Sequence, residues 1–492
     1  MTALLPLVMV GPIVVAGLAL LTPRAFVRRA LGMGATVAVL ASAVTMVVAT
    51  REGEHLATQV GGWTEGVAIA FVADLLSALM LVLTSLLVVV SLGFAAATGE
   101  DDDRWFVPLV LVLSAGVYGA LLTADLFNLF VAIEVALIPS YVLMSRGASP
   151  GVLPAGRLYL VVNLLASTIY LLGVALLYGA AGTVNLGSLL GAGREPEVAL
   201  AGAVILVALA VKSGLVPVHG WLPRTYPAPS PAVTALFSGL LTKIGVYAVF
   251  RVYSVLFDGE VRWGIPVLVV AGASMLVGVL GALGGSTVRG VLAFHMVSQM
   301  GYIVVVLGFG TPAALAAGIF YLLTYTMVKT SLFLSMGVVE HRWRTGRIDR
   351  LGGIARRDPL LGATFFAAAM SLVGVPPMVG FIAKYAVVRA GFETGHYVVT
   401  ALAVVVSLLT LLSMMKLWNG VFWGDEPPAE VRGHEPDGRA PVALVLPGLV
   451  LAALALGVGL VPQPFYALAE QAAAGLADPT AYSNAVVGEE QP

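Results

Sequence analysis

Long apolar runs separated by short polar stretches fill almost the whole chain. A helix needs about 20 apolar residues to cross the roughly 30 Å of hydrocarbon in a bilayer, and runs of about 18 or more are candidates. Such runs lie near residues 4–22, 30–50, 69–97, 106–123, 125–145, 157–181, 198–219, 229–256, 264–285, 289–308, 312–337, 360–391, 398–423 and 441–462. The pattern predicts an all-α polytopic membrane protein with about fourteen transmembrane helices.

Two of these runs carry the same interruption, Pro-x-x-Gly-aromatic beside a lysine. One reads Pro217-Val-His-Gly-Trp221, and the other, which begins Pro376-Pro377, reads Pro377-Met-Val-Gly-Phe381. Proline removes a backbone donor and unwinds a helix, which a membrane tolerates only where the freed groups face protein or a wet cavity. Paired broken helices in two halves of a carrier indicate its ion sites. A packing kink is the alternative at either position.

The arginines are distributed unequally between the two sides of the predicted bundle. With about fourteen spans, about sixteen arginines fall on one side; the other side keeps Arg51, Arg194, Arg251, Arg262 and Arg389. The positive-inside rule therefore predicts that the first side is cytoplasmic and that both termini lie outside. The acidic run at 100–103 then lies on the cytoplasmic side as well.

Composition agrees with a membrane protein and excludes several other classes. Hydrophobic residues make up 59% of the chain and charged residues 11%, and cysteine is absent. The lack of cysteine excludes disulfides, iron–sulfur clusters and zinc–thiolate sites, and the net charge of −1 gives no basic footprint for nucleic acid. With no soluble nucleotide-binding glycine motif and few histidines for haem, no cofactor is expected. A redox enzyme acting alone is therefore disfavoured.

All five lysines lie inside apolar runs: Lys212, Lys243, Lys329, Lys384 and Lys416. A lysine in the bilayer costs several kcal/mol unless it meets a partner or water, so such residues are by default functional. Together they predict a route for protons or ions. Lys416 lies toward one end of its run, where snorkelling to the interface is an equal alternative.

Glu134 is the only glutamate in the middle of a predicted span. A carboxylate there needs a cation or a proton, and pairing with Lys212 would favour the charged form of both groups. A passing proton would open and close such a pair. The alternative is a static interhelical salt bridge.

Further polar residues form two predicted stripes. His295 and Gln299 share a helix face, with Ser298 beside them; Tyr321, Tyr325 and Lys329 repeat at four-residue spacing. Histidine is suited to shuttling protons, although a hydrogen-bonded packing role is also open. Lys243 is interpreted as a relay between helices, and Lys384 as the far end of the path. For Asp74, we favour a structural role at a helix end or beside an arginine.

Five segments, in this order and spacing, resemble the antiporter-like family shared by complex I-type proton-pumping subunits and the large subunits of Mrp-type sodium/proton antiporters. The segments are Asp125–Glu134, Lys212–Pro223, Pro229–Lys243, Arg289–Gly301 and Gly374–Lys384. The resemblance implies fourteen helices with two inverted five-helix repeats, each containing a broken helix. The expected divisions are 1–105, 106–256 and 257–424 for the N-terminal segment and the two repeats, and 425–492 for a loop, the last span and a tail.

The resemblance also implies roles for single residues. Glu134 and Lys212 correspond to the family's Glu–Lys pair, Lys243 to its connecting lysine and Lys384 to the terminal lysine. The family often has Ser-His-x-Gly where this chain has Ser298-Gln299-Met300-Gly301, and often has histidine at Tyr325. His295 lies one turn before the histidine of the family's Ser-His-x-Gly. Fewer motif residues therefore support a central relay through His295 and Lys329.

Within the family, the motifs are most similar to D-type subunits of Mrp antiporters. That similarity implies H⁺ and Na⁺ as transported ions, other membrane subunits as partners, no redox centre and the cell membrane of a prokaryote. A proton-pumping subunit of a complex I-type NADH–quinone oxidoreductase or related hydrogenase is the alternative, and an inactive structural subunit is a third. No carboxylate cluster identifies a sodium site.

Overall fold

The structure is a computed structural model of the chain. It describes residues 2–62, 68–146, 151–257, 263–428, 430, 434 and 436–488. Two arginines counted in the assignment of sides, Arg262 and Arg432, lie outside these residues.

Helices dominate the described residues, as the apolar runs predict. Twelve of them are long and apolar enough to cross a membrane, and α4 and α14 are shorter apolar helices. The spans are α1 (Leu4–Leu21), α2 (Ala25–Thr50), α3 (Leu75–Thr98), α4 (Phe106–Leu122), α5 (Leu126–Met144), α6 (Val152–Ala181), α7 (Pro196–Ser213), α9 (Pro231–Phe257), α10 (Gly264–Gly284), α11 (Val288–Phe309), α12 (Pro312–Trp343), α14 (Pro359–Val373) with α15 (Val379–Glu393), α16 (Tyr397–Leu417) and α17 (Val442–Leu460). The prediction of an all-α polytopic membrane protein is confirmed.

Two segments differ from the simplest interpretation of the apolar runs. The run at 69–97 is not one helix, because Ala70–Ala73 forms β2, which pairs antiparallel with β1 (Leu56–Gln59). The side chain of Asp74 then caps α3 by accepting from the Ser77 N–H at 2.9 Å. Beyond the last predicted span, the expected tail forms α18 (Gln463–Ala477) and α19 (Thr480–Val487).

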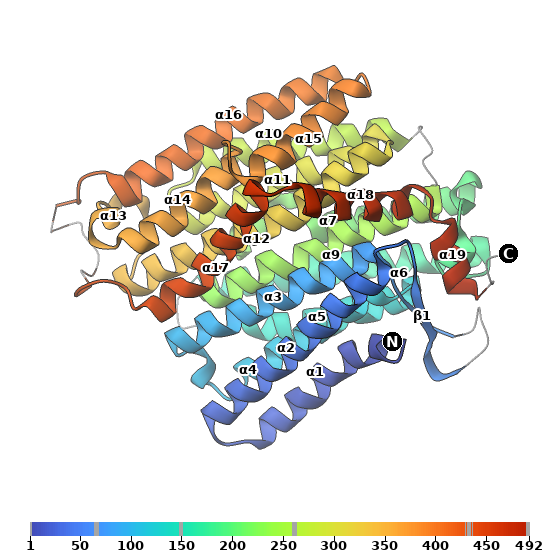
Figure 1. Ribbon diagram of the computed structural model, residues 1–492, viewed down its shortest axis with the longest axis horizontal. Helices are drawn as coiled ribbons and strands as arrows, with labels where there is room; N and C mark the ends of the chain where they lie inside the picture. The colour runs from blue at the N-terminus through green and yellow to red at the C-terminus, as the bar shows by residue number, and fades with distance from the viewer. Residues whose placement is uncertain are drawn as a thin grey trace.

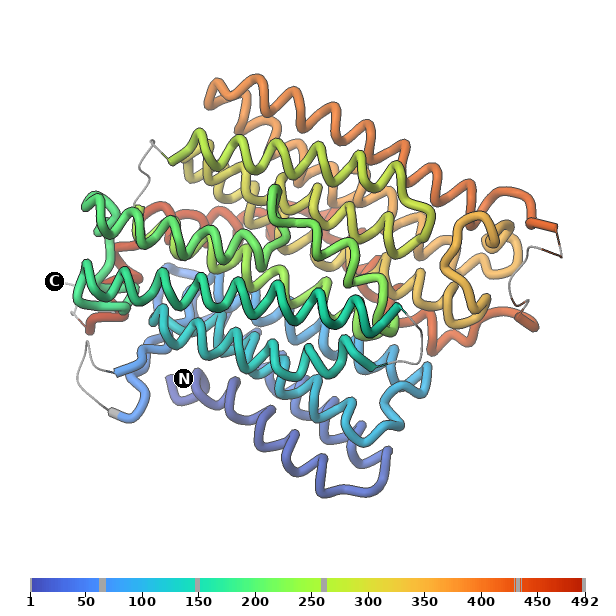
Figure 2. The backbone as a smooth tube through the Cα atoms, turned by 180° about the vertical axis from the view of Figure 1, so that it is seen from behind, coloured from blue at the N-terminus to red at the C-terminus, as the bar shows by residue number. Residues whose placement is uncertain are grey.

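The helices lie side by side and run in broadly the same direction (Figure 1). The colour passes from blue α1–α4 at one edge, through green and yellow, to orange α14–α16 at the opposite edge, and red α17 and α18 then return across the middle of the bundle. Figure 2, from behind, shows α6 and α7 on the opposite side from α17 and α18. Almost every residue of α9 and most of α12 are buried, which places these two helices at the centre.

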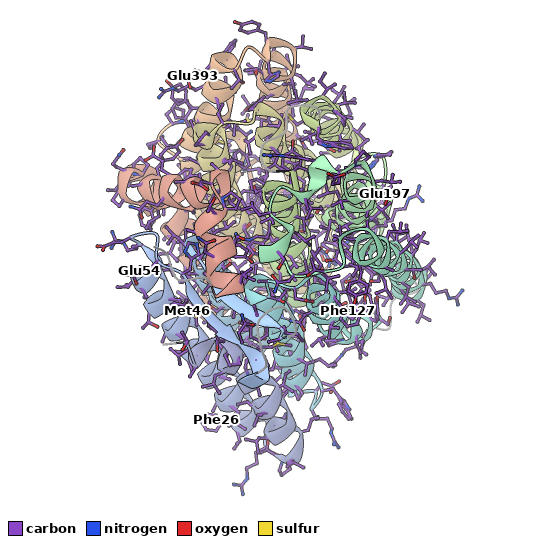
Figure 3. The ribbon with its side chains drawn as sticks, turned by 90° about the vertical axis from the view of Figure 1, so that its right-hand side faces the viewer. Phe26, Met46, Glu54, Phe127, Glu197 and Glu393 are labelled. Carbon is purple, nitrogen blue, oxygen red and sulfur yellow. The ribbon has the colours of Figure 1, made fainter. Side chains whose placement is uncertain are left out.

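The two ends of the bundle carry different loops. The arginine-rich face is the end with the loops at 22–24, 99–105, 226–230 and 344–358, to the left in Figure 1. The arginine-poor face, with α19 and the β1–β2 hairpin, is to the right. In the view from that end, Glu54, Glu197 and Glu393 lie well apart around the periphery (Figure 3).

Both broken helices form where the Pro-x-x-Gly-aromatic motif predicts them. Helix α7 ends at Gly214 (φ 71°) and α14 ends at Gly374 (φ 89°), a left-handed conformation that glycine adopts without a Cβ clash. After Gly214, the chain continues through a short turn into α8 (Leu222–Thr225); after Gly374, it continues into α15. Because α7 runs toward the arginine-rich face and α14–α15 away from it, the breaks are inverted relative to each other. The residue limits of the two repeats stay a prediction.

Candidate functional site

The first break positions Lys212 against α6. Near the end of α7, the carbonyl of Val211 accepts from the Gly214 N–H at 3.1 Å and from the Trp221 indole N–H at 2.9 Å. Lys212 is the second-last residue of α7 and is 7% exposed. Its ammonium donates to the Ser167 hydroxyl at 2.9 Å, and that hydroxyl donates to Oε1 of Glu134 on α5.

The expected Glu134–Lys212 pair is therefore joined through a third residue. Ser167 accepts from the ammonium and donates to the carboxylate, so a single hydroxyl connects three helices. Ser167 was not among the residues predicted from the sequence. The sequence feature that could have identified Ser167 is its position in an apolar run, one turn after Asn163. Buried polar side chains in such a run are costly unless they are paired.

We expect Ser167→Ala to slow ion exchange roughly 10- to 100-fold, since a hydrogen bond to a charged group contributes about 1.5–3 kcal/mol. Ser167→Thr, which keeps the hydroxyl, should retain most of the rate. The measurement is the initial rate of sodium-driven proton movement in membrane vesicles. Thr168→Ala is the matched control, because Thr168 is exposed and bonds only to the Leu164 carbonyl of its own helix among the described residues. Equal rates for Ser167→Ala and wild type would show that Glu134 and Lys212 act without this bridge.

Lys243 lies at the centre of the bundle and is 0% exposed. Its ammonium donates to the Ser238 carbonyl at 2.7 Å and to the Thr242 hydroxyl at 3.3 Å. It also lies 4.9 Å from the centre of the Tyr325 ring on α12. Lys243 therefore faces α12, which the sequence assigns to the predicted second repeat.

A small cavity lies between Lys212 and α9. Its volume is about 20 Å³, and its lining includes Asn163, Lys212, Tyr226, Ile244 and Gly245. A polar cavity above about 10–15 Å³ holds a water molecule. The cavity thus has room for about one water beside Lys212.

The predicted stripe at His295 is only partly assembled. The His295 Nε2 lies 2.9 Å from the Ser413 hydroxyl on α16, and the Tyr321 hydroxyl donates to Oε1 of Gln299. Ser298 instead donates to the Met275 carbonyl of α10 at 2.9 Å, which uses its hydroxyl proton within a helix contact. Ser298 can therefore offer the expected water-holding stripe of Ser298, Gln299 and His295 only its acceptor lone pairs.

Lys329 lies deep between α11 and α12. Its ammonium donates to the Leu292 carbonyl at 2.5 Å and lies 5.1 Å from the centre of the Phe333 ring. Tyr325, one turn before Lys329, is the residue that faces Lys243. The Tyr325–Lys329 stripe thus connects the first repeat to α11, which carries His295.

At the second break, the unwinding frees a backbone carbonyl that binds Lys384. The Lys384 ammonium donates to the Val373 carbonyl at 2.9 Å and to the Ser407 hydroxyl on α16 at 3.1 Å. Lys384 follows its glycine, Gly374, whereas Lys212 precedes Gly214, so the two lysines approach their breaks from opposite ends. A second cavity, of about 10 Å³, lies between Tyr321, Tyr325 and Gly380 and has room for about one water.

Several buried polar atoms along this route have no partner among the described residues. They are the Tyr226 and Tyr325 hydroxyls, His295 Nδ1 and Gln299 Nε2. Buried polar groups are nearly always hydrogen-bonded, so such atoms indicate bound water. The geometry is therefore suited to a hydrated chain of Glu134, Lys212, Lys243, Lys329, His295 and Lys384.

Lys416 and Asp74 have contacts that suit structural roles. The Lys416 ammonium donates to the carbonyls of Leu283 at 2.8 Å and Gly285 at 2.5 Å, at the end of α10. Asp74 caps α3 and also pairs with the buried Arg251 at 2.5 Å. Both structural roles considered for Asp74, anchoring a helix end and pairing with an arginine, are present. Among the described residues, no group of three or more His, Cys, Asp or Glu side chains could hold a metal ion.

Comparison with known proteins gives the same family as the motifs. The family described as NADH:quinone oxidoreductase/Mrp antiporter, TM, matches residues 123–410. The D-type subunit of the Na(+)/H(+) antiporter of Alkalihalophilus pseudofirmus is 36% identical over 469 residues, which is 94% of each chain.

Solved structures agree with this result. A chain of the Mrp complex from Dietzia sp. superposes with a TM-score of 0.96 at 45% identity over 99% of each chain. A chain of respiratory complex I from Thermus thermophilus gives a TM-score of 0.83 at 24% identity over 98% of this chain and 99% of that chain, which shows a common fold. With the broken helices and the buried Glu and Lys residues in the expected places, the chain belongs to the family of transmembrane subunits of NADH:quinone oxidoreductases and Mrp antiporters.

Proposed function

We propose that this chain is the proton-translocating membrane subunit of a multi-subunit sodium/proton antiporter. The observation that carries the proposal is the pair of inverted broken helices, each holding a buried lysine, with Lys243 and Lys329 between them. The full-length similarity to a D-type Na(+)/H(+) antiporter chain supports this function over that of a redox pump. The chain has no redox centre of its own in this mechanism and acts as a transporter.

Proton transfer begins at the first break. Lys212 holds a proton while its ammonium is bonded to Ser167, and Glu134 balances that charge through the same hydroxyl. When Glu134 moves away or takes up a proton, the charged form of Lys212 loses its stabilisation. Lys212 then passes its proton through the adjoining cavity toward Lys243.

The proton continues through the centre of the bundle. Lys243 faces Tyr325 across the interface between α9 and α12, and the route passes Lys329 and His295. Gln299, Tyr321 and the Ser413 hydroxyl line the next part with buried polar groups. The path ends at Lys384, where the Val373 carbonyl and the Ser407 hydroxyl stabilise the ammonium. Lys416 is at most a supporting member of the path.

The proposed setting is a bacterial cell membrane with both termini outside and the arginine-rich face in the cytoplasm. The similar Dietzia chain is part of an Mrp complex, which supports neighbouring membrane subunits as partners here. Sodium is the proposed counter-ion. The described residues of this chain offer it no group of three or more His, Cys, Asp or Glu side chains.

The experiment that tests this function follows proton movement with a pH-sensitive dye. Everted vesicles from an antiporter-deficient host carry this chain together with the products of the neighbouring genes. We expect addition of sodium to an acidified vesicle to restore the fluorescence of the dye, because sodium enters in exchange for protons. If acidification follows NADH oxidation and ignores sodium, the chain serves a complex I-type pump instead.

A further inference from the structure

A cavity whose lining carries both signs of charge lies between α15 and α18 at the arginine-poor face. Its volume is about 280 Å³, and Ala313 of α12 also lines it. It is far larger than the cavities beside the buried lysines, and it approaches the roughly 300 Å³ at which small-molecule sites begin. None of its lining residues belongs to the proposed proton path.

The charged residues of this cavity lie at its outer end, which is the end at the arginine-poor face. Helix α15 ends there at Glu393, and α18 also runs toward this face (Figure 1). Arg389 lies one turn before Glu393, and Glu470 lies one turn after Tyr466 on α18. The Tyr466 hydroxyl interacts electrostatically with all three charged groups, so they surround one space.

The lining carries no charge toward the middle of the bilayer. Ile382 and Ala386 contribute to it from α15, and Pro462 and Gln463 from the start of α18. From Ile382 to Glu393, the helix rises about 16 Å, which is about half of the roughly 30 Å of hydrocarbon. The cavity is therefore charged at the membrane interface and uncharged below it, which is the order of groups in a phospholipid.

The side chains around the cavity indicate that it opens to lipid. Tyr385, Phe392 and Tyr397 are exposed on one side of it, and Phe465 of α18 is exposed on the other. Exposed aromatic side chains near the end of a span are typical of the membrane interface. An amphiphile can therefore enter the cavity from the bilayer.

The charged groups of the cavity have unused bonding capacity. Arg389 donates through Nε to Oε1 of Glu393 at 2.7 Å, and its two terminal nitrogens have no hydrogen-bond partner among the described residues. Glu470 is exposed and forms no hydrogen bond or ion pair within the described part of the chain. A guanidinium binds phosphate strongly, and a carboxylate accepts from an ammonium group. Together they offer partners for both charges of a zwitterion.

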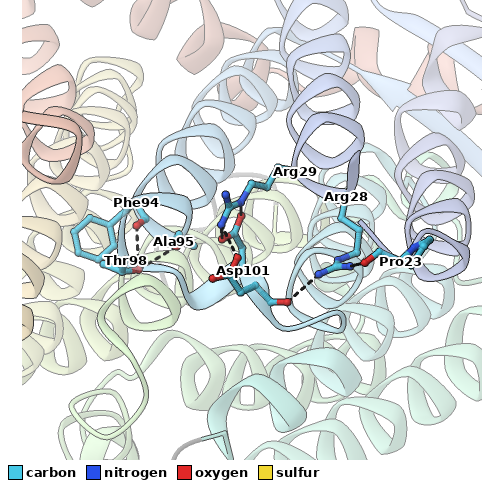
Figure 4. A network of polar contacts seen from close by, with 8 residues as sticks. Pro23, Arg28, Arg29, Phe94, Ala95, Thr98 and Asp101 are labelled. Atoms are coloured by element: carbon cyan, nitrogen blue, oxygen red, sulfur yellow. Dashed lines mark hydrogen bonds and ion pairs between the residues drawn. The ribbon is translucent and has the colours of Figure 1, made fainter. Parts of the chain in front are cut away.

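Arginines at the opposite face show the contrast. Arg29 uses both Nε and a terminal nitrogen on Asp101, and it also bonds to Asp102 at 2.8 Å. Figure 4 shows Arg29 against Asp101, with Arg28 bonded to the Pro23 carbonyl beside it. These two arginines hold loops of the protein together, whereas most donors of Arg389 remain open to a ligand.

We propose that this cavity binds one phospholipid with an ethanolamine headgroup, in the leaflet at the arginine-poor face. The phosphate accepts from Arg389, and the ammonium group donates to Glu470 and to the free lone pairs of Glu393. The Gln463 amide lies at the depth of the ester groups, and the acyl chains continue past Ile382. This inference goes beyond the proposed function and does not depend on it, since binding requires no transport.

The headgroup follows from the balance of charge. Arg389, Glu393 and Glu470 together carry one net negative charge, so an anionic headgroup such as phosphatidylglycerol would add a second. The ammonium of ethanolamine instead neutralises its own phosphate and has N–H groups for the carboxylates. The trimethylammonium of choline carries the same charge but has no N–H group to donate.

The test uses phosphatidylethanolamine with a photoreactive diazirine on one acyl chain, mixed into the bilayer around the assembled complex. After illumination, mass spectrometry of the peptides locates the label. We expect labelling of α15 near Ile382 and of α18 near Pro462, about fivefold stronger than with a phosphatidylglycerol probe of the same chain length. A matched phosphatidylcholine probe should also label these segments weakly.

Reversal of charge at Glu470 separates recognition of the headgroup from general contact with lipid. Glu470→Lys should lower labelling by the ethanolamine probe and raise labelling by the glycerol probe, because two cations then face one phosphate. Glu470 is exposed, so the change should leave the fold intact. Glu197→Lys is the control, since Glu197 is exposed at the same face and lies far from Glu393 (Figure 3). It should label as wild type does.

Two results would overturn the headgroup site. One is equal labelling by the ethanolamine and glycerol probes, both in wild type and in Glu470→Lys. The other is the absence of label from α15 and α18 in the assembled complex, which would mean that another subunit fills the cavity. Loss of sodium-driven proton movement in wild type would contradict the proposed function and leave the labelling result unaffected.

Discussion

Replacement of Lys212 by alanine is expected to abolish sodium-driven proton movement. The substitution removes the proton carrier at the first break and leaves the Ser167 hydroxyl and the Glu134 carboxylate without their cation. Loss of a positioned proton-transfer group typically costs roughly 100-fold or more in rate. Dye fluorescence in everted vesicles measures the rate, and co-purification of the other subunits measures assembly.

A lipid-facing position on the same helix provides the control for Lys212. Val207 is 53% exposed on α7, so Val207→Ala removes a similar amount of side chain without touching the buried contacts. This variant should transport at the wild-type rate. If Lys212→Ala also assembles and transports at that rate, the first break carries no proton.

Replacement of Lys384 by alanine is expected to have an effect of similar size at the other end of the path. The ammonium of Lys384 binds the Val373 carbonyl and the Ser407 hydroxyl at the second break, and no other lysine or arginine makes either contact among the described residues. Protons that reach His295 would then have no acceptor on the way out. The rate of proton movement should fall by roughly 100-fold or more.

Two further variants distinguish a lost proton carrier from a damaged fold at Lys384. Lys384→Arg retains a positive charge and donors but holds its proton permanently, so it should assemble and still fail to transport. Phe392→Ala, at an exposed position of α15, should transport normally. Full activity in Lys384→Ala would rule out the proposed exit, and full activity in Lys384→Arg would mean that the residue acts by its charge alone.

Much of the fold could be predicted because a bilayer imposes simple rules on sequence. Every span must be apolar for about 20 residues, so the helices could be placed by counting. A proline in such a run must free backbone groups, so both breaks were visible in the sequence itself. A buried lysine is costly, so the five lysines stood out individually. Each of these constraints acts on a residue through its depth in the membrane and its immediate neighbours in the chain.

The start of α3 and the end of the chain were less predictable, because their structure depends on partners elsewhere in the chain. Residues 70–73 are as apolar as the helix that follows, and only their pairing with β1 makes them a strand. Helix α18 packs along α12, where Tyr466 lies 5.2 Å from Phe320 between ring centres. Hydropathy alone does not distinguish a strand, a packed helix and a span when the partner lies elsewhere in the chain.

The sequence by itself determined the membrane class, the spans, the two breaks and the charged residues that need partners. The tertiary structure alone decided which partners they have. It placed Ser167 between Glu134 and Lys212, Ser413 beside His295 and Ser407 beside Lys384. It bonded Ser298 and Lys416 to helix carbonyls. The physical reason is that hydrophobic burial is specified residue by residue along the chain. A hydrogen bond reaches only about 3 Å, and it joins helices that are far apart in the sequence, so the sequence does not show which two side chains will meet.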